Sequence, residues 1–295
     1  MTRRDVPVIL EVAINGATRR ERNPHVPISP AEISAVALEC LELGAQIVHQ
    51  HDDIGPQGAT PEQMAELGLR AYEPVLARFP DAILYPTTNW GGTTPEGRWG
   101  HHFALAQKGV LRMAYVDPGS VNIGTPGADG VPASGILYAN ELAFVNWKFE
   151  QCARLRLGPN MALFEPGFVR VVRAYERAGR LPPGAFAKFY FGDAMSFGLP
   201  PTRAALAAYL ELLEGSNLVW AAAVIGGDLV GSGMAKLALE AGGHLRVGLE
   251  DFGGRRAPSN QELVREAVAL CRSVGRPLAT RAQAAEILGL PRRAA

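Results

Sequence analysis

The chain has 295 residues, of which 47% are hydrophobic and 20% charged, and its 29 basic side chains balance 29 acidic ones. A neutral chain without a strongly basic stretch gives no reason to expect a nucleic-acid partner. No run of 18 apolar residues is present, so we expect no membrane span, and the N-terminal residues lack a signal-peptide core. Cys40, Cys152 and Cys271 lie far apart, which favours buried thiols in a reducing, cytoplasmic compartment over disulfides.

Strand and helix patterns alternate along the whole chain. Runs rich in apolar and β-branched residues predict strands at 6–12, 46–51, 82–87, 111–116, 160–164, 186–191, 218–225 and 244–248. Helical periodicity predicts helices at 30–43, 60–79, 95–105, 140–157, 168–178, 202–213, 231–241 and 259–274, with a short helix after residue 280. Ser29 and Thr60 each precede a proline and stand three residues before Glu or Gln, which predicts capping boxes. A Gly- and Pro-rich stretch at 124–132 is predicted to be a loop.

Eight strand-then-helix units without a compositional break predict one (β/α)8 TIM barrel over residues 1–295, with a short C-terminal helical extension. The alternative is a doubly wound open sheet. The loop after the first strand does not have the G-x-G-x-x-G pattern of such sheets, and eight regular units suit closure into a barrel. We therefore favour the barrel.

In TIM barrels the chemistry lies at the C-terminal ends of the strands, so polar residues at those ends are candidate site residues. In chain order they are Asn15, His49, His51, Thr87, Thr88, Tyr115, Asp117, Ser120, Asn122, Glu165, Asp193, Arg246, Glu250 and Asp251.

His49 and His51 stand two residues apart at the end of the second strand. Side chains at that spacing in an extended chain point to the same face, so the two imidazoles can converge on one metal ion. Closure places the eighth strand and the second strand on either side of the first, about 10 Å apart. Glu250, after the eighth strand, then becomes a third ligand. Two histidines and one carboxylate with an open position are typical of a catalytic site for zinc or another divalent metal.

Arg246 and Asp251 add a second set of charges beside Glu250. Arg246 can pair with a carboxylate and fix its ionisation, and Asp251 next to a metal can act as a general base. The alternative is that the Glu-Asp pair belongs to a solvated loop or caps the next helix. The residues by themselves leave both interpretations open.

The chain resembles a known family. The matching segments are 14–17, 24–33, 44–51, 113–122, 242–251, 259–260 and 275–280, and they run in order over almost the whole sequence. The combination of His-x-His with Arg-x-Gly-Leu-Glu-Asp is similar to that of the beta-keto acid cleavage enzymes, to which 3-keto-5-aminohexanoate cleavage enzyme belongs.

The resemblance implies a zinc-dependent (β/α)8 acyltransferase, usually a homo-oligomer, with a tetramer favoured. Such enzymes convert a β-keto acid and acetyl-CoA into acetoacetate and a new acyl-CoA. It implies zinc ligands at His49, His51 and Glu250, and a catalytic base at Asp251 steadied by Arg246. It also implies a catalytic hydroxyl contact at Thr87, where the family has a serine.

Departures from the family concern the substrate. The 3-keto-5-aminohexanoate enzyme carries a glutamate for the substrate's amino group where this chain has Thr18, and it has a threonine in place of Tyr115. We therefore expect a neutral or anionic β-keto acid, with Asn15, Thr18, Thr88 and Tyr115 as substrate-binding residues. Arg19 or Arg20 meets a second carboxylate, or both are merely solvated.

Two further hypotheses differ in reaction class. A metal-dependent hydrolase or an aldolase-type lyase on the same barrel would use the open metal position for water or an enolate. A barrel that has lost activity and only binds a ligand is disfavoured, because all five residues of the predicted metal and base set are present. No phosphate-binding signature for CoA stands out, and the pairs Gly91-Gly92 and Gly226-Gly227 are as well explained as turn glycines.

Overall fold

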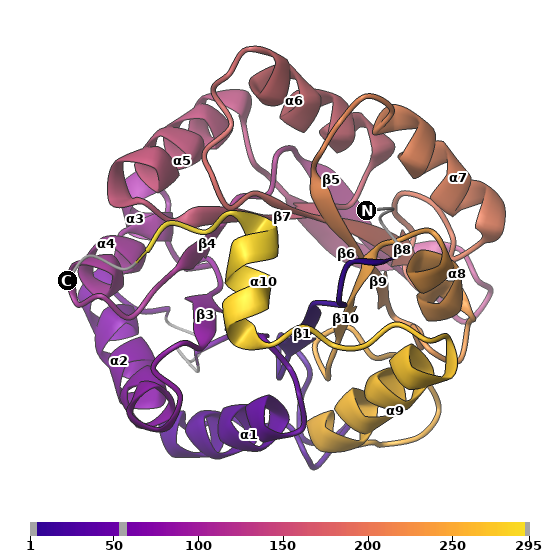
Figure 1. Ribbon diagram of the computed structural model, residues 1–295, viewed down its shortest axis with the longest axis horizontal. Coiled ribbons are helices and arrows are strands. Elements are labelled where there is room, and N and C mark those ends of the chain that lie inside the picture. The colour runs from indigo at the N-terminus through magenta and orange to yellow at the C-terminus, as the bar shows by residue number, and fades with distance from the viewer. Residues whose placement is uncertain (1–4, 53–57, 293–295) are drawn as a thin grey trace.

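The computed structural model describes residues 5–52 and 58–292 and shows a nearly closed barrel of parallel strands (Figure 1). Within these residues the sheet has eight strands in the order β3-β2-β1-β10-β9-β8-β7-β4. Their bounds are β1 Leu10–Ala13, β2 Ile47–Gln50, β3 Ile83–Pro86, β4 Met113–Tyr115, β7 Gly158–Leu163, β8 Phe186–Gly192, β9 Val219–Ile225 and β10 His244–Val247. Because β1 pairs with both β2 and β10, the barrel prediction is confirmed and the open-sheet alternative is wrong.

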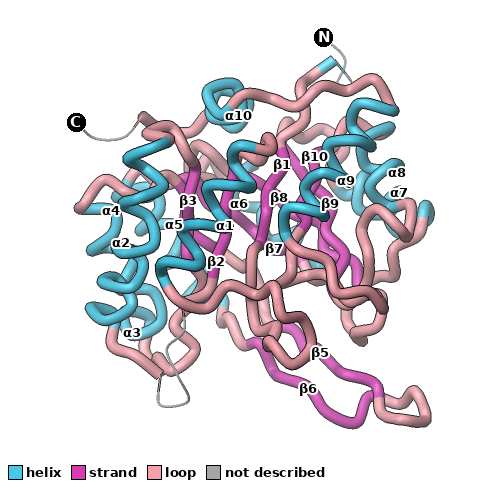
Figure 2. Tube along the Cα trace, turned by 90° about the horizontal axis from the view of Figure 1, so that it is seen from below, coloured by secondary structure: helices cyan, strands magenta, loops and turns pink. Residues whose placement is uncertain are grey.

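Helices form a ring around the strands (Figure 1). They are α1 Pro30–Glu42, α2 Pro61–Arg78, α3 Pro95–Trp99, α4 His101–Gln107, α5 Leu142–Leu155, α6 Pro166–Arg177, α7 Arg203–Leu212, α8 Met234–Glu240 and α9 Asn260–Ser273. Both predicted capping boxes are present, with Ser29 accepting from the Glu32 amide and Thr60 from the Gln63 amide. The terminal helix α10 (Arg281–Leu288) lies across the end of the barrel where the strands begin (Figures 1 and 2). None of the helices in the described residues is long and apolar enough to cross a lipid bilayer.

Within the stretch predicted as a loop at 124–132, residues 127–131 do connect two strands, but the residues on either side belong to an antiparallel hairpin, formed by β5 (Val121–Pro126) and β6 (Pro132–Tyr138). Gly124 and Gly135 face each other across it, and a Cβ on Gly135 would lie 2.3 Å from the Ile123 carbonyl oxygen. Gly124 and Gly135 therefore allow close approach of the two strands. The hairpin projects from the end of the barrel where the strands finish (Figure 2).

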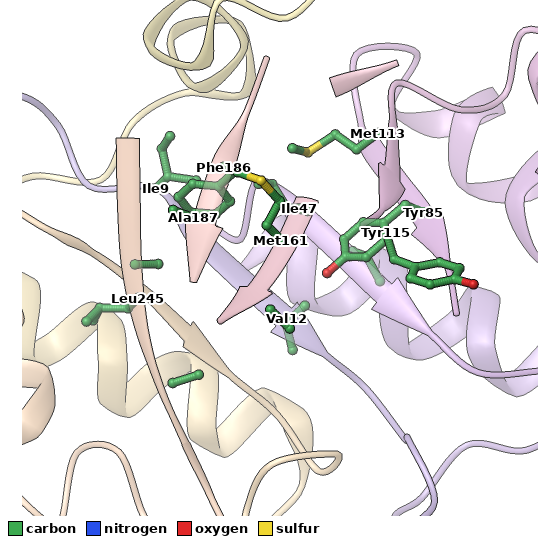
Figure 3. Packing of buried hydrophobic residues seen from close by; sticks show 14 of the residues in the cluster. Ile9, Val12, Ile47, Tyr85, Met113, Tyr115, Met161, Phe186, Ala187 and Leu245 are labelled. Carbon is green, nitrogen blue, oxygen red and sulfur yellow. The ribbon is translucent and has the colours of Figure 1, made fainter. Parts of the chain in front are cut away.

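The barrel interior is filled by side chains from all sides (Figure 3). Ile9, Met161 and Phe186 are completely buried near the start of the strands. His101 and His102 are buried in α4, and the Nε2 atom of His101 lies 2.8 Å from the Thr87 carbonyl oxygen. β3 and β4 stand at the two ends of the strand order and are not hydrogen-bonded to each other. His101 therefore binds a main-chain group beside the place where the sheet is not continuous.

Candidate active site

His49, His51 and Glu250 converge at the C-terminal end of the barrel. His49 is in register with Ala13 of β1, and Glu250 follows β10 on the other side of β1. The Nε2 atoms of His49 and His51 lie 3.3 Å and 3.5 Å from the two carboxylate oxygens of Glu250. One ligand atom from each residue lies within 4.8 Å of the others. Barrel closure thus brings Glu250 next to two histidines, although His49 and Glu250 are 201 positions apart in the sequence.

His49 is oriented by the main chain of β3. Its Nδ1 atom lies 3.2 Å from the Tyr85 carbonyl oxygen, and its ring stacks on the Tyr85 ring at 4.4 Å. A carbonyl only accepts, so Nδ1 carries the proton and Nε2 presents a lone pair to Glu250. Burial lowers the pKa of His49 to about 3, so the imidazole is neutral.

This donor set fits a divalent metal ion. The Glu250 oxygen that faces His49 is buried and has no hydrogen-bond partner among the described residues. Two acceptors, an imidazole lone pair and a carboxylate oxygen, therefore face each other at 3.3 Å. A cation between them removes that repulsion, and neutral imidazoles with a carboxylate suit zinc.

Asn15 and Gly16, which follow β1, position the residues of the site. Asn15 holds the main chain of His51, and Gly16 leaves space for the Glu250 side chain. The Asn15 side chain accepts from the His51 amide at 2.8 Å and donates to the His51 carbonyl at 2.8 Å, so both main-chain groups of that histidine are fixed. It also accepts from the Gly16 amide and donates to the Pro27 carbonyl. Gly16 has φ +58°, and a Cβ there would lie 2.3 Å from the Cγ of Glu250. The Glu250 side chain occupies the space that this glycine leaves open.

Arg246 links the carboxylates of the site. Its Nε and Nη2 atoms bind the two oxygens of Asp251 at 2.8 Å and 3.1 Å, and Nη2 also lies 3.0 Å from Glu250. Burial alone would raise the pKa of Glu250, but the charge of Arg246 holds it well below its usual value. Burial raises the pKa of Asp251, and Arg246 opposes that rise. The pairing of Arg246 with a carboxylate, predicted from the sequence, is present.

Arg246 also belongs to a buried network that the sequence patterns did not predict. Glu11, completely buried on β1, accepts from Arg246 at 2.7 Å, Lys188 at 3.1 Å, Tyr85 at 2.5 Å and Asn160 at 2.9 Å. Burial raises the pKa of Glu11, but the charges of Lys188 and Arg246 outweigh it and lower the pKa to about 2. The signal was a single glutamate inside the apolar run of the first strand. A lone charge in such a run indicates a buried ion pair.

The other predicted site residues lie either beside Glu250 or at the ends of β3 and β4. Thr18 lies beside the site, where its hydroxyl donates to the Leu249 carbonyl at 2.7 Å. Thr87 and Thr88 follow β3; the Thr88 hydroxyl donates to the Arg98 carbonyl at 3.4 Å. Tyr115 is buried at the end of β4, with its ring 5.4 Å from His102 and 4.8 Å from the Lys148 nitrogen.

Two cavities open at the mouth of the barrel. The larger has a volume of about 860 Å³, and its walls include Asn15, Thr18, His51 and Trp90. The smaller, of about 360 Å³, reaches Glu250 and Asp251. Both share the segment 17–19 as a dividing wall. Thr87, Thr88 and Tyr115 are not among the described residues that line either cavity.

Comparison with known proteins finds relatives over nearly the whole chain. The chain is 32% identical over 296 residues to the 3-oxoadipate:acetyl-CoA acetyltransferase of Cupriavidus necator, covering 97% of this chain and 95% of that protein. It is 30% identical to the 3-keto-5-aminohexanoate cleavage enzyme of Fusobacterium nucleatum, covering 96% and 98%. The structure of ObcA bound to oxaloacetate is similar in fold, with a TM-score of 0.66, 18% identity, and coverage of 91% of this chain and 68% of that one.

The family model for beta-keto acid cleavage enzymes matches residues 7–290, which include every strand of the barrel and every residue of the convergent site. With that match and the relatives above, the chain belongs to the beta-keto acid cleavage enzyme family.

Proposed function

We propose that this protein is a zinc-dependent acyltransferase that condenses a β-keto acid with acetyl-CoA and releases acetoacetate and a new acyl-CoA. The observation that carries the proposal is the set of two imidazoles and one carboxylate beside the buried Arg246–Asp251 pair. The names of the relatives, an acetyl-CoA acetyltransferase and a keto acid cleavage enzyme, support the same reaction. The whole chain, 1–295, then acts as one catalytic unit.

His49, His51 and Glu250 would hold the zinc ion, which when bound polarises the keto oxygen and stabilises negative charge on it. Asp251, aimed by two bonds from Arg246, accepts a proton from the carbon between the keto and carboxylate groups. The resulting carbanion attacks the acetyl thioester and expels CoA thiolate. That thiolate attacks the original keto carbon, the carbon–carbon bond breaks, and acetoacetate leaves after recovering the proton.

Asn15 and Thr18 contribute mainly by position in this proposal. The side-chain amide of Asn15 makes four hydrogen bonds to main-chain groups, and two of these are to His51. The hydroxyl proton of Thr18 is used on Leu249, next to Glu250. Thr87 is proposed as the hydroxyl contact of the reaction, and Thr88 and Tyr115 as substrate contacts on the side of β3 and β4, although none of these three described residues lines either cavity.

The substrate is proposed to be neutral or anionic, and the two arginines of the first loop differ. Arg20 already contacts Glu32 at 2.6 Å and the Val26 carbonyl at 3.3 Å. Arg19 forms no ion pair with the described residues and borders both cavities. A second substrate carboxylate would find its partner in Arg19, in keeping with the relative named for 3-oxoadipate.

Metal analysis and turnover test the function. We expect about one zinc per chain and acetoacetate formation only with acetyl-CoA. The variant His49→Ala should lose both metal and activity. Turnover without acetyl-CoA would instead favour the hydrolase or lyase hypothesis, and activity in a metal-free enzyme would contradict the zinc proposal.

A substrate panel tests the charge preference. Keto acids that differ only in the distal group (carboxylate, methyl or ammonium) should rank in that order by kcat/KM. Arg19→Gln should reduce the preference for the distal carboxylate about tenfold, whereas Arg20→Gln should leave it nearly unchanged. A clear preference of the wild type for the ammonium compound would contradict the proposal.

We also propose that the protein works as a homo-oligomer, a tetramer by family resemblance, in the cytoplasm. The hairpin exposes 60% of Val131, 51% of Ile136 and 67% of Leu137, apolar surface that a second copy would cover. Three buried free thiols suit a reducing compartment. Light scattering after size exclusion should give a multiple of the chain mass for the wild type and a smaller species for Leu137→Asp.

A further inference from the structure

The two mouth cavities differ in size and in the part of the site they reach. The larger, about 860 Å³, reaches His51, and the smaller, about 360 Å³, reaches Glu250 and Asp251. The residues Thr18 and Arg19 stand between them and belong to both. Two cavities that share residues at one centre can each hold one substrate of a two-substrate reaction.

The smaller cavity suits the β-keto acid. Its walls hold Asp251, which must reach the carbon that loses a proton, and Arg19, the candidate partner for a distal carboxylate. Met195, Ile225 and Phe252 add apolar surface, and Glu21 and Arg22 are further charged residues of the lining. A short acid with charged ends and an apolar middle matches this lining.

The larger cavity suits a long ligand with an apolar arm and an aromatic, phosphorylated end. Val26, Pro27 and Ile28 contribute apolar surface to the lining, which also includes His51 and Arg20. Trp90 is also part of the lining, although 51% of its surface is exposed. A tryptophan that borders a cavity and remains exposed is a surface on which a nucleotide base can stack.

Trp90 is held in place although it is exposed. Its ring packs against Tyr138 at the base of the hairpin, with 5.1 Å between ring centroids. The Tyr138 hydroxyl in turn donates to Asp117 at 2.5 Å. The neighbouring Asn89 side chain donates to the carbonyls of Ala59 and Gly97. The loop that carries Trp90 is therefore pre-organised, which lowers the entropic cost of binding.

We propose that the larger cavity is the acyl-CoA subsite, with the adenine stacked on Trp90, the pantetheine arm along residues 26–28 and the thioester near His51, while the keto acid occupies the smaller cavity. The proposal rests on acetyl-CoA being the co-substrate. It makes Trp90 and Met195 specificity residues for different substrates of the same reaction.

Paired variants test the assignment by steady-state kinetics on the zinc-loaded enzyme. Trp90→Ala should raise the KM for acetyl-CoA about tenfold, the order expected for loss of one base–aromatic stack, with the KM for the keto acid unchanged. Met195→Ala should do the reverse. Trp90→Phe should restore most of the affinity, and Leu142→Ala, an apolar residue that is 62% exposed and lines neither cavity, should change neither constant. An unchanged KM for acetyl-CoA in Trp90→Ala would overturn the assignment.

Equilibrium titration separates this inference from the proposed function. Free CoA, which carries no acyl group to transfer, is titrated into wild type and Trp90→Ala and followed by calorimetry. Weaker binding in the variant supports the subsite even in a protein that does not turn over acetyl-CoA. Equal binding by the two proteins overturns the subsite and leaves the reaction itself standing, if acetoacetate still forms. A wild type that neither binds CoA nor uses acetyl-CoA overturns both.

Discussion

At the scale of single residues, the site depends on contacts that only one side chain type can make. One Arg246 guanidinium binds Glu11, Glu250 and Asp251, so two buried carboxylates and one partly buried carboxylate share one charge. Lys188 supplies a second charge to Glu11. Such a network is stable only when complete, because removing one partner leaves another buried and unpaired.

The variant Glu11→Gln tests that network. The carboxylate charge between Lys188 and Arg246 is lost, so two buried cations lose their partner and the free energy of unfolding should fall by about 3 kcal/mol. Urea unfolding measures the change. The control is Glu32→Gln, which removes an exposed ion pair with Arg20. Apart from any loss of helix capping, this change should lower the free energy of unfolding by less than about 1 kcal/mol. Equal stability of Glu11→Gln and wild type would show that the network is not stabilising.

Gly16 allows a second test at this scale. An added methyl group would occupy the position of the Glu250 side chain, so Gly16→Ala should lower zinc content more than tenfold at limiting metal. Gly179→Ala is the matched control, because that glycine has φ +66° but nothing within 4 Å of its Cβ position. Both variants carry the backbone strain of about 1–2 kcal/mol, and only the first blocks Glu250. Similar zinc content in the two variants would mean that steric conflict with Glu250 is unimportant.

At the scale of elements, the strands place the site and the loops after them complete it. His49 and Arg246 lie on strands that flank β1, whereas His51, Glu250 and Asp251 lie in loops. The first residue of α9 ties these loops together. The Asn260 side chain donates to the Ile14 carbonyl at 2.7 Å and accepts from the Leu249 amide at 3.1 Å. Helix α9 therefore anchors the end of β1 and the residue before Glu250.

Asn260→Ala should separate anchoring from helix capping. The loss of two buried bonds should reduce stability by about 2–3 kcal/mol and weaken zinc binding about tenfold, since Glu250 loses its support. Ser259→Ala removes only the N-cap of the same helix, should cost about 1 kcal/mol and should leave zinc affinity unchanged. Competition with a chromogenic chelator measures the affinity. If the two variants bind zinc equally well, Asn260 has no anchoring role.

At the scale of the whole molecule, burial of several histidines should make stability depend on pH. Burial lowers the pKa of His49 and His244 to about 3, that of His101 to about 4, and that of His102 well below 6.5. Below pH 6.5 the unfolded chain therefore binds more protons than the folded chain, and stability is lost as the pH falls. Asp52 and Asp251, whose pKa values burial raises, act in the opposite direction but are outnumbered.

Thermal unfolding between pH 7 and pH 5 measures this effect. The Tm of the metal-free protein should fall by several degrees over that interval, with a chelator present so that metal release does not contribute. His101→Gln keeps a donor for the Thr87 carbonyl and cannot be protonated, so its Tm should depend less steeply on pH. A Tm that stays level or rises toward pH 5 would contradict the prediction.

The sequence by itself determined the number and order of the barrel strands, the capped helix starts and the convergent residues His49, His51, Arg246, Glu250 and Asp251. These features follow from local periodicity, local capping and the family motif. Only the tertiary structure decided the pairing of Glu11 with four side chains, the clamp of Asn15 on His51, and the hairpin at 121–138. The reason is physical: those contacts join residues that are distant in the chain, and glycine-rich segments form either loops or close strand pairs according to what approaches them.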